Sequence, residues 1–283
     1  MILTFDAWSH TPGLAPWVGA LTVLAVLFYG LASALRDTPQ SVPADPAAAP
    51  GAFGLVGISL WAGWALHAAL IGLDVLSAGL DTARFGFAPA LSITAWLVLG
   101  VYGIENRFLP LTGARRALSL WALASVVLAS IFPGEFFPHV APWAPLHWVL
   151  GLASYGLFGA AVLHAVLLNR AERRLRQKEV ALGTPGLPLL RLERLTFRFV
   201  EAGFGVLTAA LLLGWWVSSP WRWDHKAVFS LLGWGVFAAL LIGRHAFGWR
   251  GLQATRWLYV GTGLLLLGYV GSRFVLEVLM PAR

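Results

Sequence analysis

The chain contains eight apolar stretches that are each long enough to cross a lipid bilayer as an α-helix. Crossing the hydrocarbon core takes about 20 apolar residues, because backbone groups in lipid must be hydrogen-bonded within the spanning segment. We expect the spans at about residues 16–35, 52–73, 86–106, 117–133, 145–169, 199–218, 226–243 and 257–279. The sequence therefore predicts an all-α fold, a polytopic membrane helix bundle that forms a single integral-membrane domain over residues 1–283.

The composition excludes several classes of soluble protein. Only 12% of the residues are charged and 58% are hydrophobic, whereas a soluble globular protein carries about 25% charged residues. A cytosolic enzyme, a disordered chain and a nucleic-acid binder are therefore not expected. The chain has no cysteine, so disulfides, zinc–thiolate sites, iron–sulfur clusters and covalent haem attachment are excluded as well.

The distribution of Lys and Arg predicts the orientation in the membrane. Fifteen of these residues fall in the loops after the first, third, fifth and seventh spans, and four fall on the opposite side. Because cytoplasmic loops carry the excess of positive charge, we expect both termini on the outer, periplasmic side. Residues 170–198 are expected to form a long basic cytoplasmic loop that lies on anionic lipid headgroups.

Two histidines are the first candidates for a functional site, because ionisable residues are rare within a bilayer. His67 falls in the outer half of the second span, and His147 near the outer start of the fifth. Helical spacing places Gly151 and Tyr155 on the same face as His147, with Ser154 and Phe158. An imidazole beside glycine and aromatic rings suits a flat macrocycle, but a hydrogen-bonded histidine at a helix contact gives the same pattern.

The other polar residues within the predicted spans are expected to have structural roles. His164 lies in the cytoplasmic half of the fifth span and is predicted to be a packing residue, or at best a separate inner site. Glu105 and Glu201 lie at the cytoplasmic ends of their spans and are predicted to pair with Arg107 and Arg198. The sequence carries no P-loop, GxSxG, HExxH or EF-hand pattern, so a hydrolase or an ATP-driven pump is not expected.

The outer loop between the sixth and seventh spans is rich in tryptophan. Residues 215–226 read WWVSSPWRWDHK, with four Trp within nine positions. Interfacial Trp usually anchors a protein in the membrane, but this density exceeds what anchoring needs, and Trp143 and Trp148 would extend the loop to an aromatic platform. Arg222 and Lys226 are suited to pair with carboxylates such as haem propionates.

Two segments resemble the cytochrome c assembly protein family, the haem-handling membrane proteins of the CcsA and CcmC type. They are HWVLGLASYGLF at residues 147–158 and WRWDHKAVFSLLGWGVFAALL at 221–241. Further runs resemble the small YpjD-like inner-membrane branch of this family: residues 187–214, 243–251 and 267–279. The resemblance covers about residues 52–280.

This resemblance implies a bundle of eight or more spans in the bacterial inner membrane. Such a protein binds b-type haem without covalent attachment and presents it on the outer side for transfer to apocytochrome c. His147 matches the histidine that opens the family's HxxxxxxSY helix, and Trp221, Trp223, Asp224 and Lys226 match the Trp-rich motif. The larger members carry a further histidine at a place where this chain has Ile242.

The sequence as a whole thus predicts a haem-handling protein in cytochrome c assembly, with imidazoles of His67 and His147 as axial ligands to the iron of haem b. The expected haem-binding residues are His67, His147, Trp221, Arg222, Trp223, Asp224 and Lys226. Positioning haem involves no bond chemistry, so an enzyme is not expected. Expected partners are membrane lipids, haem and apocytochrome c or other cytochrome-biogenesis proteins, and no nucleic acid.

The alternative is a small-solute or cation transporter, or an accessory subunit of a membrane complex, that binds no haem. In that case the histidines and acidic residues on the outer side would form a cation-binding vestibule or would be satisfied by packing. A transporter predicts broken helices and a polar midplane. The predicted spans are continuous and carry little charge at mid-depth, which favours haem handling.

Overall fold

The computed structural model describes residues 15–35, 54–78, 82–107, 111, 113–138, 142–177, 189–217 and 223–280. The elements in these ranges are helices and two short strands: α1 (Ala15–Ala34), α2 (Leu55–Ala78), β1 (Thr82–Phe85), α3 (Phe87–Glu105), α4 (Arg115–Ile131), β2 (Glu135–Pro138), α5 (Ala144–Arg176), α6 (Leu189–Val217), α7 (His225–Phe247), α8 (Gly251–Leu266), the π-helical segment η2 (Leu267–Gly271), α9 (Ser272–Phe274) and the π-helical segment η3 (Val275–Leu279). The segments α8, η2, α9 and η3 follow one another directly and form the last helix of the chain, which we call the C-terminal helix.

Each predicted span is helical in the structure. Seven of the described helices are long and apolar enough to cross a membrane, the C-terminal helix among them. The remaining one is α4, which has 17 residues and is therefore shorter than a typical span. It is bounded by Arg115 and Arg116 at its start and by Pro133 just after its end, so the apolar stretch cannot lengthen at either side.

One expectation about the loops was wrong, and one feature of them was not predicted. The basic segment 170–198 was predicted to be a loop, but α5 continues to Arg176 and α6 already begins at Leu189. These extensions are rich in Arg, Leu and Glu, which are strong helix formers. The strands β1 and β2 were not predicted at all. They pair antiparallel, from Thr82 opposite Pro138 to Phe85 opposite Glu135.

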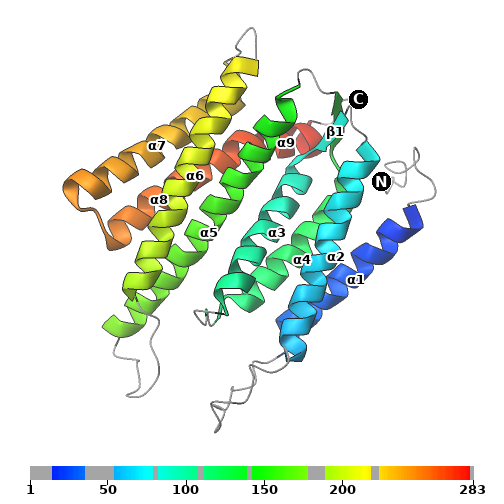
Figure 1. Cartoon of the computed structure of the whole chain (residues 1–283), viewed down its shortest axis with the longest axis horizontal. Helices are drawn as coiled ribbons and strands as arrows, with labels where there is room; N and C mark the ends of the chain where they lie inside the picture. Colours follow the sequence, from blue (N-terminus) through cyan, green and yellow to red (C-terminus); the bar gives the residue numbers. More distant parts are fainter. Residues whose placement is uncertain are drawn as a thin grey trace.

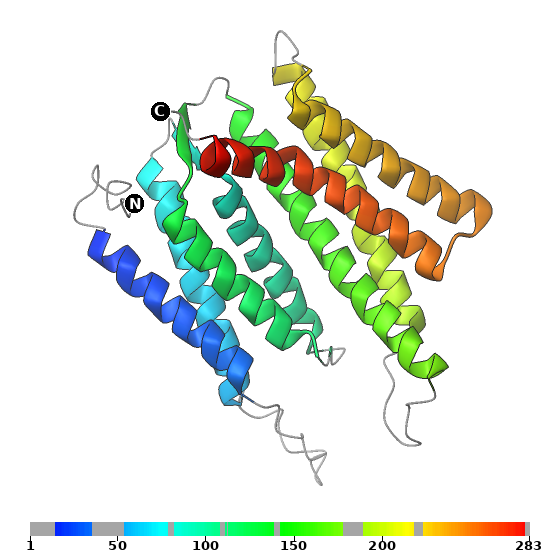
Figure 2. The ribbon, with the colours of Figure 1, turned by 180° about the vertical axis from the view of Figure 1, so that it is seen from behind.

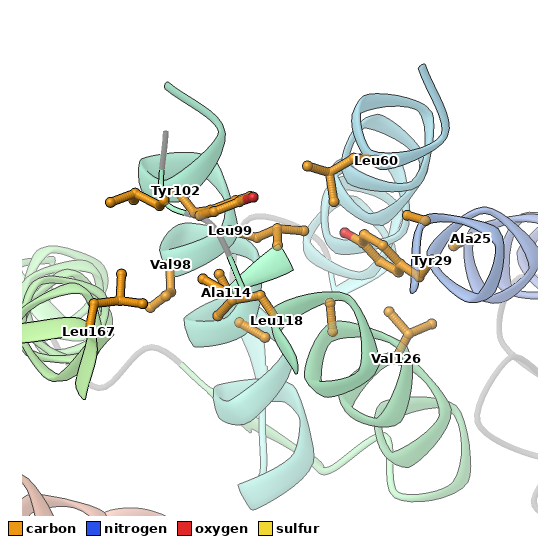
Figure 3. Close-up of a cluster of buried hydrophobic side chains, with 14 of the residues drawn as sticks. Ala25, Tyr29, Leu60, Val98, Leu99, Tyr102, Ala114, Leu118, Val126 and Leu167 are labelled. Carbon is orange, nitrogen blue, oxygen red and sulfur yellow. The ribbon is translucent and has the colours of Figure 1, made fainter. Parts of the chain in front are cut away.

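Figure 1 shows the arrangement of the helices, which pack around two hydrophobic clusters. The first is formed mainly by α1 to α4, and Figure 3 shows it around Tyr29, Leu60 and Leu99. The second is formed by α5 to α8, around Phe158 and Phe237, whose rings stack at 3.9 Å. The helix α3 packs directly against α5, so the α3–α5 contact joins the two halves of the bundle.

The C-terminal helix crosses the bundle obliquely and ends beside the strands (Figure 2, in red). On its way η2 contacts both α3 and α7. Arg273 then places Nη1 3.4 Å from a carboxylate oxygen of Glu135 and its guanidinium 4.5 Å from the Phe137 ring centre. These contacts fasten the C-terminal helix to β2. We call this end of the bundle, where β1 and β2 lie, the strand end, and the opposite one the basic end.

Two adjacent arginines fix the end of α1 at the basic end of the bundle. The last carbonyl groups of a helix have no partner within the helix. The Arg115 guanidinium donates hydrogen bonds to the carbonyl groups of Ala32 and Leu35, the latter at 2.7 Å, and Arg116 donates to Ser33 at 2.9 Å. Cations are also favoured at this pole of the helix dipole. These bonds attach α1 to the start of α4.

Candidate functional site at the strand end

His147 lies one turn into α5, at the strand end of the bundle. Its Nδ1 is 2.8 Å from the carbonyl oxygen of Ala210 on α6. A carbonyl oxygen can only accept, so Nδ1 carries the hydrogen and Nε2 of the neutral ring keeps its lone pair. Within the described part of the chain Nε2 makes no hydrogen bond. This nitrogen is therefore able to bind a metal ion, and its orientation is fixed by the bond at Nδ1.

Two glycines leave room for the His147 ring and for a ligand. A Cβ atom at Gly214 of α6 would lie 2.7 Å from Cε1 of His147, which is too close, so the ring rests on bare backbone. One turn below His147, a Cβ at Gly151 would meet no atom within 4 Å. Further down the same face the Tyr155 hydroxyl donates to Leu265, and Phe158 belongs to the second cluster. Among the described residues of this face, the part around His147 and Gly151 is therefore the part that is open to a ligand.

The Gly214 contact gives a testable prediction. Replacement of Gly214 by alanine is expected to displace the His147 ring and to weaken the binding of any metal centre at Nε2 about tenfold, as loss of a residue that orients a ligand does. The matched control is Gly205→Ala on the same helix, where a Cβ would meet nothing within 4 Å. Equal effects of the two substitutions on haem retention would contradict this role of Gly214.

His67 occupies a different environment. Its side chain is buried, with 1% of its surface exposed. Nδ1 lies 3.2 Å from the hydroxyl of Tyr29 on α1, and Nε2 lies 2.7 Å from the hydroxyl of Ser92 on α3. Both ring nitrogens are thus engaged by hydroxyl groups. The sequence pattern did not reveal either partner, because a single Tyr or Ser in an apolar span carries no positional signal.

The structure places the two predicted ligands in separate helix interfaces. His67 contacts α1 and α3, whereas His147 contacts α6. The helix α3 packs against both α2 and α5, so it stands between the helices that carry the two histidines. Joint ligation of one iron by His67 and His147 stays a prediction, and in this conformation the two rings do not share a contact.

The Trp-rich motif is described only in part. Trp221 and Arg222 lie outside the described residues. Trp223 is 73% exposed, at the strand end. Asp224 precedes α7, and its Oδ1 accepts a hydrogen bond of 2.8 Å from the backbone N–H of Ala227. Asp224 is therefore the N-cap of α7, a local role that accounts for this residue without any ligand.

Lys226 connects the motif to His147. Its ammonium group lies 5.1 Å from the ring centre of Tyr269 on the C-terminal helix. It is close enough to interact electrostatically with His147, with Asp224 and with Arg273. The predicted site residues Lys226 and His147 are thus brought together, and the structure adds Arg273 as a second cation. Arg273 was not among the site residues predicted from the sequence.

The acidic residues at the basic end contact histidines. Glu105 Oε2 lies 2.6 Å from His164 Nε2, and Glu201 Oε1 lies 3.8 Å from His245 Nε2. The predicted partners of these carboxylates were Arg107 and Arg198, and the structure adds histidines as partners because α3 meets α5 at Glu105 and α6 meets α7 at Glu201. These partners depend on where the helices cross, and the local sequence does not show the crossing points.

The comparison with known proteins agrees with the motifs. Residues 55–280 match the profile of the family described as cytochrome C assembly protein. The chain belongs to this family. Its match begins at the first residue of α2 and extends into the end of the C-terminal helix, so it includes His67, His147 and Lys226. The matched residues thus include the second hydrophobic cluster and the part of the first cluster that lies outside α1.

Two similar proteins have names that are consistent with this assignment. The chain is 28% identical over 209 residues to the inner membrane protein YpjD of Escherichia coli, covering 71% of this chain and 77% of that protein. It is 24% identical over 246 residues to the cytochrome c biogenesis protein CcsA of Prochlorococcus marinus, covering 73% and 78%. No solved structure shows a significant match.

Proposed function

We propose that this chain is a haem-handling protein of the bacterial inner membrane that takes part in cytochrome c assembly. It holds haem b without covalent attachment at the strand end, which faces the periplasm. The observation that carries the proposal is the free Nε2 lone pair of His147, since neutral imidazole is a common axial ligand of haem iron. The family assignment, together with relatives named for cytochrome c biogenesis and for the inner membrane, supports this function.

Residues of the chain act in positioning. His147 would hold the iron through Nε2, and the Ala210 carbonyl holds the imidazole in the required tautomer. Gly214 makes room for the imidazole itself, and Gly151 leaves space beside it for the edge of a porphyrin. Lys226 would pair with a propionate carboxylate. Trp223 lies exposed at the same end, and Asp224 fixes the start of the helix that follows. When bound, haem would supply the porphyrin that is passed on to an apocytochrome c.

Two sets of ligands are possible for the iron: His147 alone, or His147 together with His67. Because Ser92 engages Nε2 of His67 and α3 packs between α2 and α5, ligation by His67 would need this hydrogen bond to break and the helices to rearrange. The described conformation therefore supports ligation by His147 alone, and joint ligation by His67 requires a second conformation. The spectrum distinguishes the two, because a single histidine leaves ferrous haem five-coordinate and high-spin, whereas two histidines make it six-coordinate and low-spin.

The direct test of the function is a haem titration of the detergent-purified full-length protein. We expect a Soret band that survives washing and shifts on reduction, and extraction of the pigment by acidified organic solvent, which removes only non-covalent haem. A protein that stays colourless in haem-replete cells and does not bind added haemin would overturn the proposal and favour the transporter or accessory-subunit alternative.

A further inference from the structure

A buried histidine and a glutamate meet near the basic end, away from the proposed haem site. His164 on α5 is fully buried, with 0% of its surface exposed, and its Nδ1 is 2.7 Å from the Ala160 carbonyl oxygen. Nδ1 therefore donates its hydrogen to that carbonyl. On the other side of the ring Nε2 lies 2.6 Å from Oε2 of Glu105 on α3. The Phe199 ring stacks on the imidazole at 5.3 Å.

Without an added proton, neither group of this pair has a hydrogen that it can donate to the other. With its hydrogen on Nδ1, a neutral His164 offers only a lone pair at Nε2, and ionised Glu105 offers only lone pairs as well. Both Oε2 and Nε2 are buried, and neither makes an aligned hydrogen bond to another described atom. Two acceptors at 2.6 Å repel each other, and the pair would leave a buried net charge of −1, which is costly.

The geometry points to a proton-binding site formed by Glu105 and His164. One proton from water converts the pair from a net charge of −1 to zero, either as imidazolium beside carboxylate or as imidazole beside carboxylic acid. The two forms differ only in where this proton lies between Nε2 and Oε2. This site goes beyond haem handling and does not depend on it.

Glu105 gives the buried imidazole a connection to the surface. Its side chain is 18% exposed although Oε2 is buried, so part of the Glu105 side chain reaches the surface of the bundle. His164 itself is fully buried, so the route between the pair and the surface runs along Glu105. Because the pair spans α3 and α5, it also lies at the contact that joins the two halves of the bundle.

Other titratable groups on the surrounding helices at this end have contacts of their own. Tyr259 of α8 is hydrogen-bonded to Asn169, and Glu193 of α6 to Arg244. Arg115 of α4 donates to α1, and Arg107 of α3 lies over the Trp61 ring. Tyr102 of α3 is buried one turn before Glu105, and the remaining described arginines of these helices at the basic end are exposed. The atoms that face each other in the contact are Oε2 of Glu105 and Nε2 of His164.

A proton shared between the two groups in the folded chain predicts a specific dependence of thermal stability on pH. An imidazole and a carboxylate in the unfolded chain hold no proton above neutral pH, so folding that keeps one proton makes stability fall as pH rises. A difference of one proton lowers the unfolding midpoint by about 3 °C per pH unit. We expect this slope in the wild-type protein and its loss in Glu105→Gln and in His164→Gln, measured in detergent at a fixed scan rate.

The exposed Glu201–His245 pair is the matched control. It has the same two residue types near the same end of the bundle, but it is 3.8 Å apart and its side chains are 48% and 68% exposed. Glu201→Gln is expected to keep the slope of the wild-type protein. A wild-type slope identical to those of Glu105→Gln and His164→Gln would overturn the proposal, as would an equal loss of slope in Glu201→Gln.

A second measurement covers the case in which the Gln variants do not fold. Wild-type protein carrying ¹⁵N-labelled histidine and ¹³C-labelled glutamate is titrated by nuclear magnetic resonance. A shared proton makes one imidazole signal and one carboxyl signal change together at the same pH, as coupled sites do. The absence of any such joint transition between neutral pH and the alkaline limit of folding would refute the shared proton.

Discussion

Replacing His147 with alanine is expected to abolish haem retention. The substitution removes an imidazole whose Nε2 makes no hydrogen bond to any described residue and whose orientation is fixed by Ala210. Since loss of a mere orienting partner costs about 10- to 100-fold in metal affinity, loss of the ligand itself should cost about 100-fold or more. The measurement is the Soret absorbance per protein after haem titration and washing of the detergent-purified variant.

His245→Ala is the matched control for this experiment. His245 also has Nδ1 at 2.8 Å from a backbone carbonyl oxygen, that of Leu241, but it is exposed and lies at the basic end. It is expected to retain haem as the wild-type protein does. His67→Ala separates the two ligation states, because it changes the spin state only where His67 is the second ligand. Unchanged haem binding in His147→Ala would contradict the proposed site.

The second large effect is expected at Gly134, just before β2. This residue has φ = 82°, which strongly favours glycine, and a Cβ there would collide with backbone atoms of Phe85 and lie 2.9 Å from the Gly86 nitrogen. Backbone atoms of a paired strand cannot move aside cheaply. The strain of the left-handed conformation and the collision together are expected to lower the unfolding midpoint of Gly134→Ala by about 10 °C.

Gly113→Ala isolates the contribution of the collision. Gly113 has nearly the same conformation, φ = 85°, but among the described residues a Cβ there would meet nothing within 4 Å. Only the conformational strain remains, so we expect a fall of about 3 °C. Equal midpoints for the two variants would show that the close approach of β1 and the Gly134 segment does not contribute to stability. The strand pair precedes α5, so Gly134→Ala should also weaken haem retention.

The positions of the helices could be predicted well from the sequence. The features that were missed, namely two helix ends and the two strands, have physical causes. Every predicted span is helical, since 20 apolar residues in lipid have few alternatives to a helix. The extended ends of α5 and α6 were missed because a span is recognised by its apolar part, whereas the charged turns outside the membrane carry no hydropathy signal. The strands β1 and β2 are four residues each and lie in loops that are far apart in sequence.

The candidate site could be predicted only in part. His147 and Lys226 were identified from motif spacing, and the structure brings them close enough to interact. The pairing of His67 with His147 was inferred from depth along two spans, and depth does not specify the direction in which a side chain points. Their contacts with Ser92 and Ala210 depend on which helices are neighbours and on their rotation.

The sequence by itself determined which segments become helices, which family the chain resembles, and which end of the bundle carries the Trp-rich motif. The tertiary structure decided the partners of each buried polar group, including the Glu105–His164 contact. The physical reason lies in the solvent. In a soluble protein the polar face of a helix lies in water, so the sequence shows that the opposite face is buried. In a membrane this signal is lost, because lipid is as apolar as a protein core. A transmembrane helix can therefore be apolar all round, and only packing against its neighbours fixes where its histidines point.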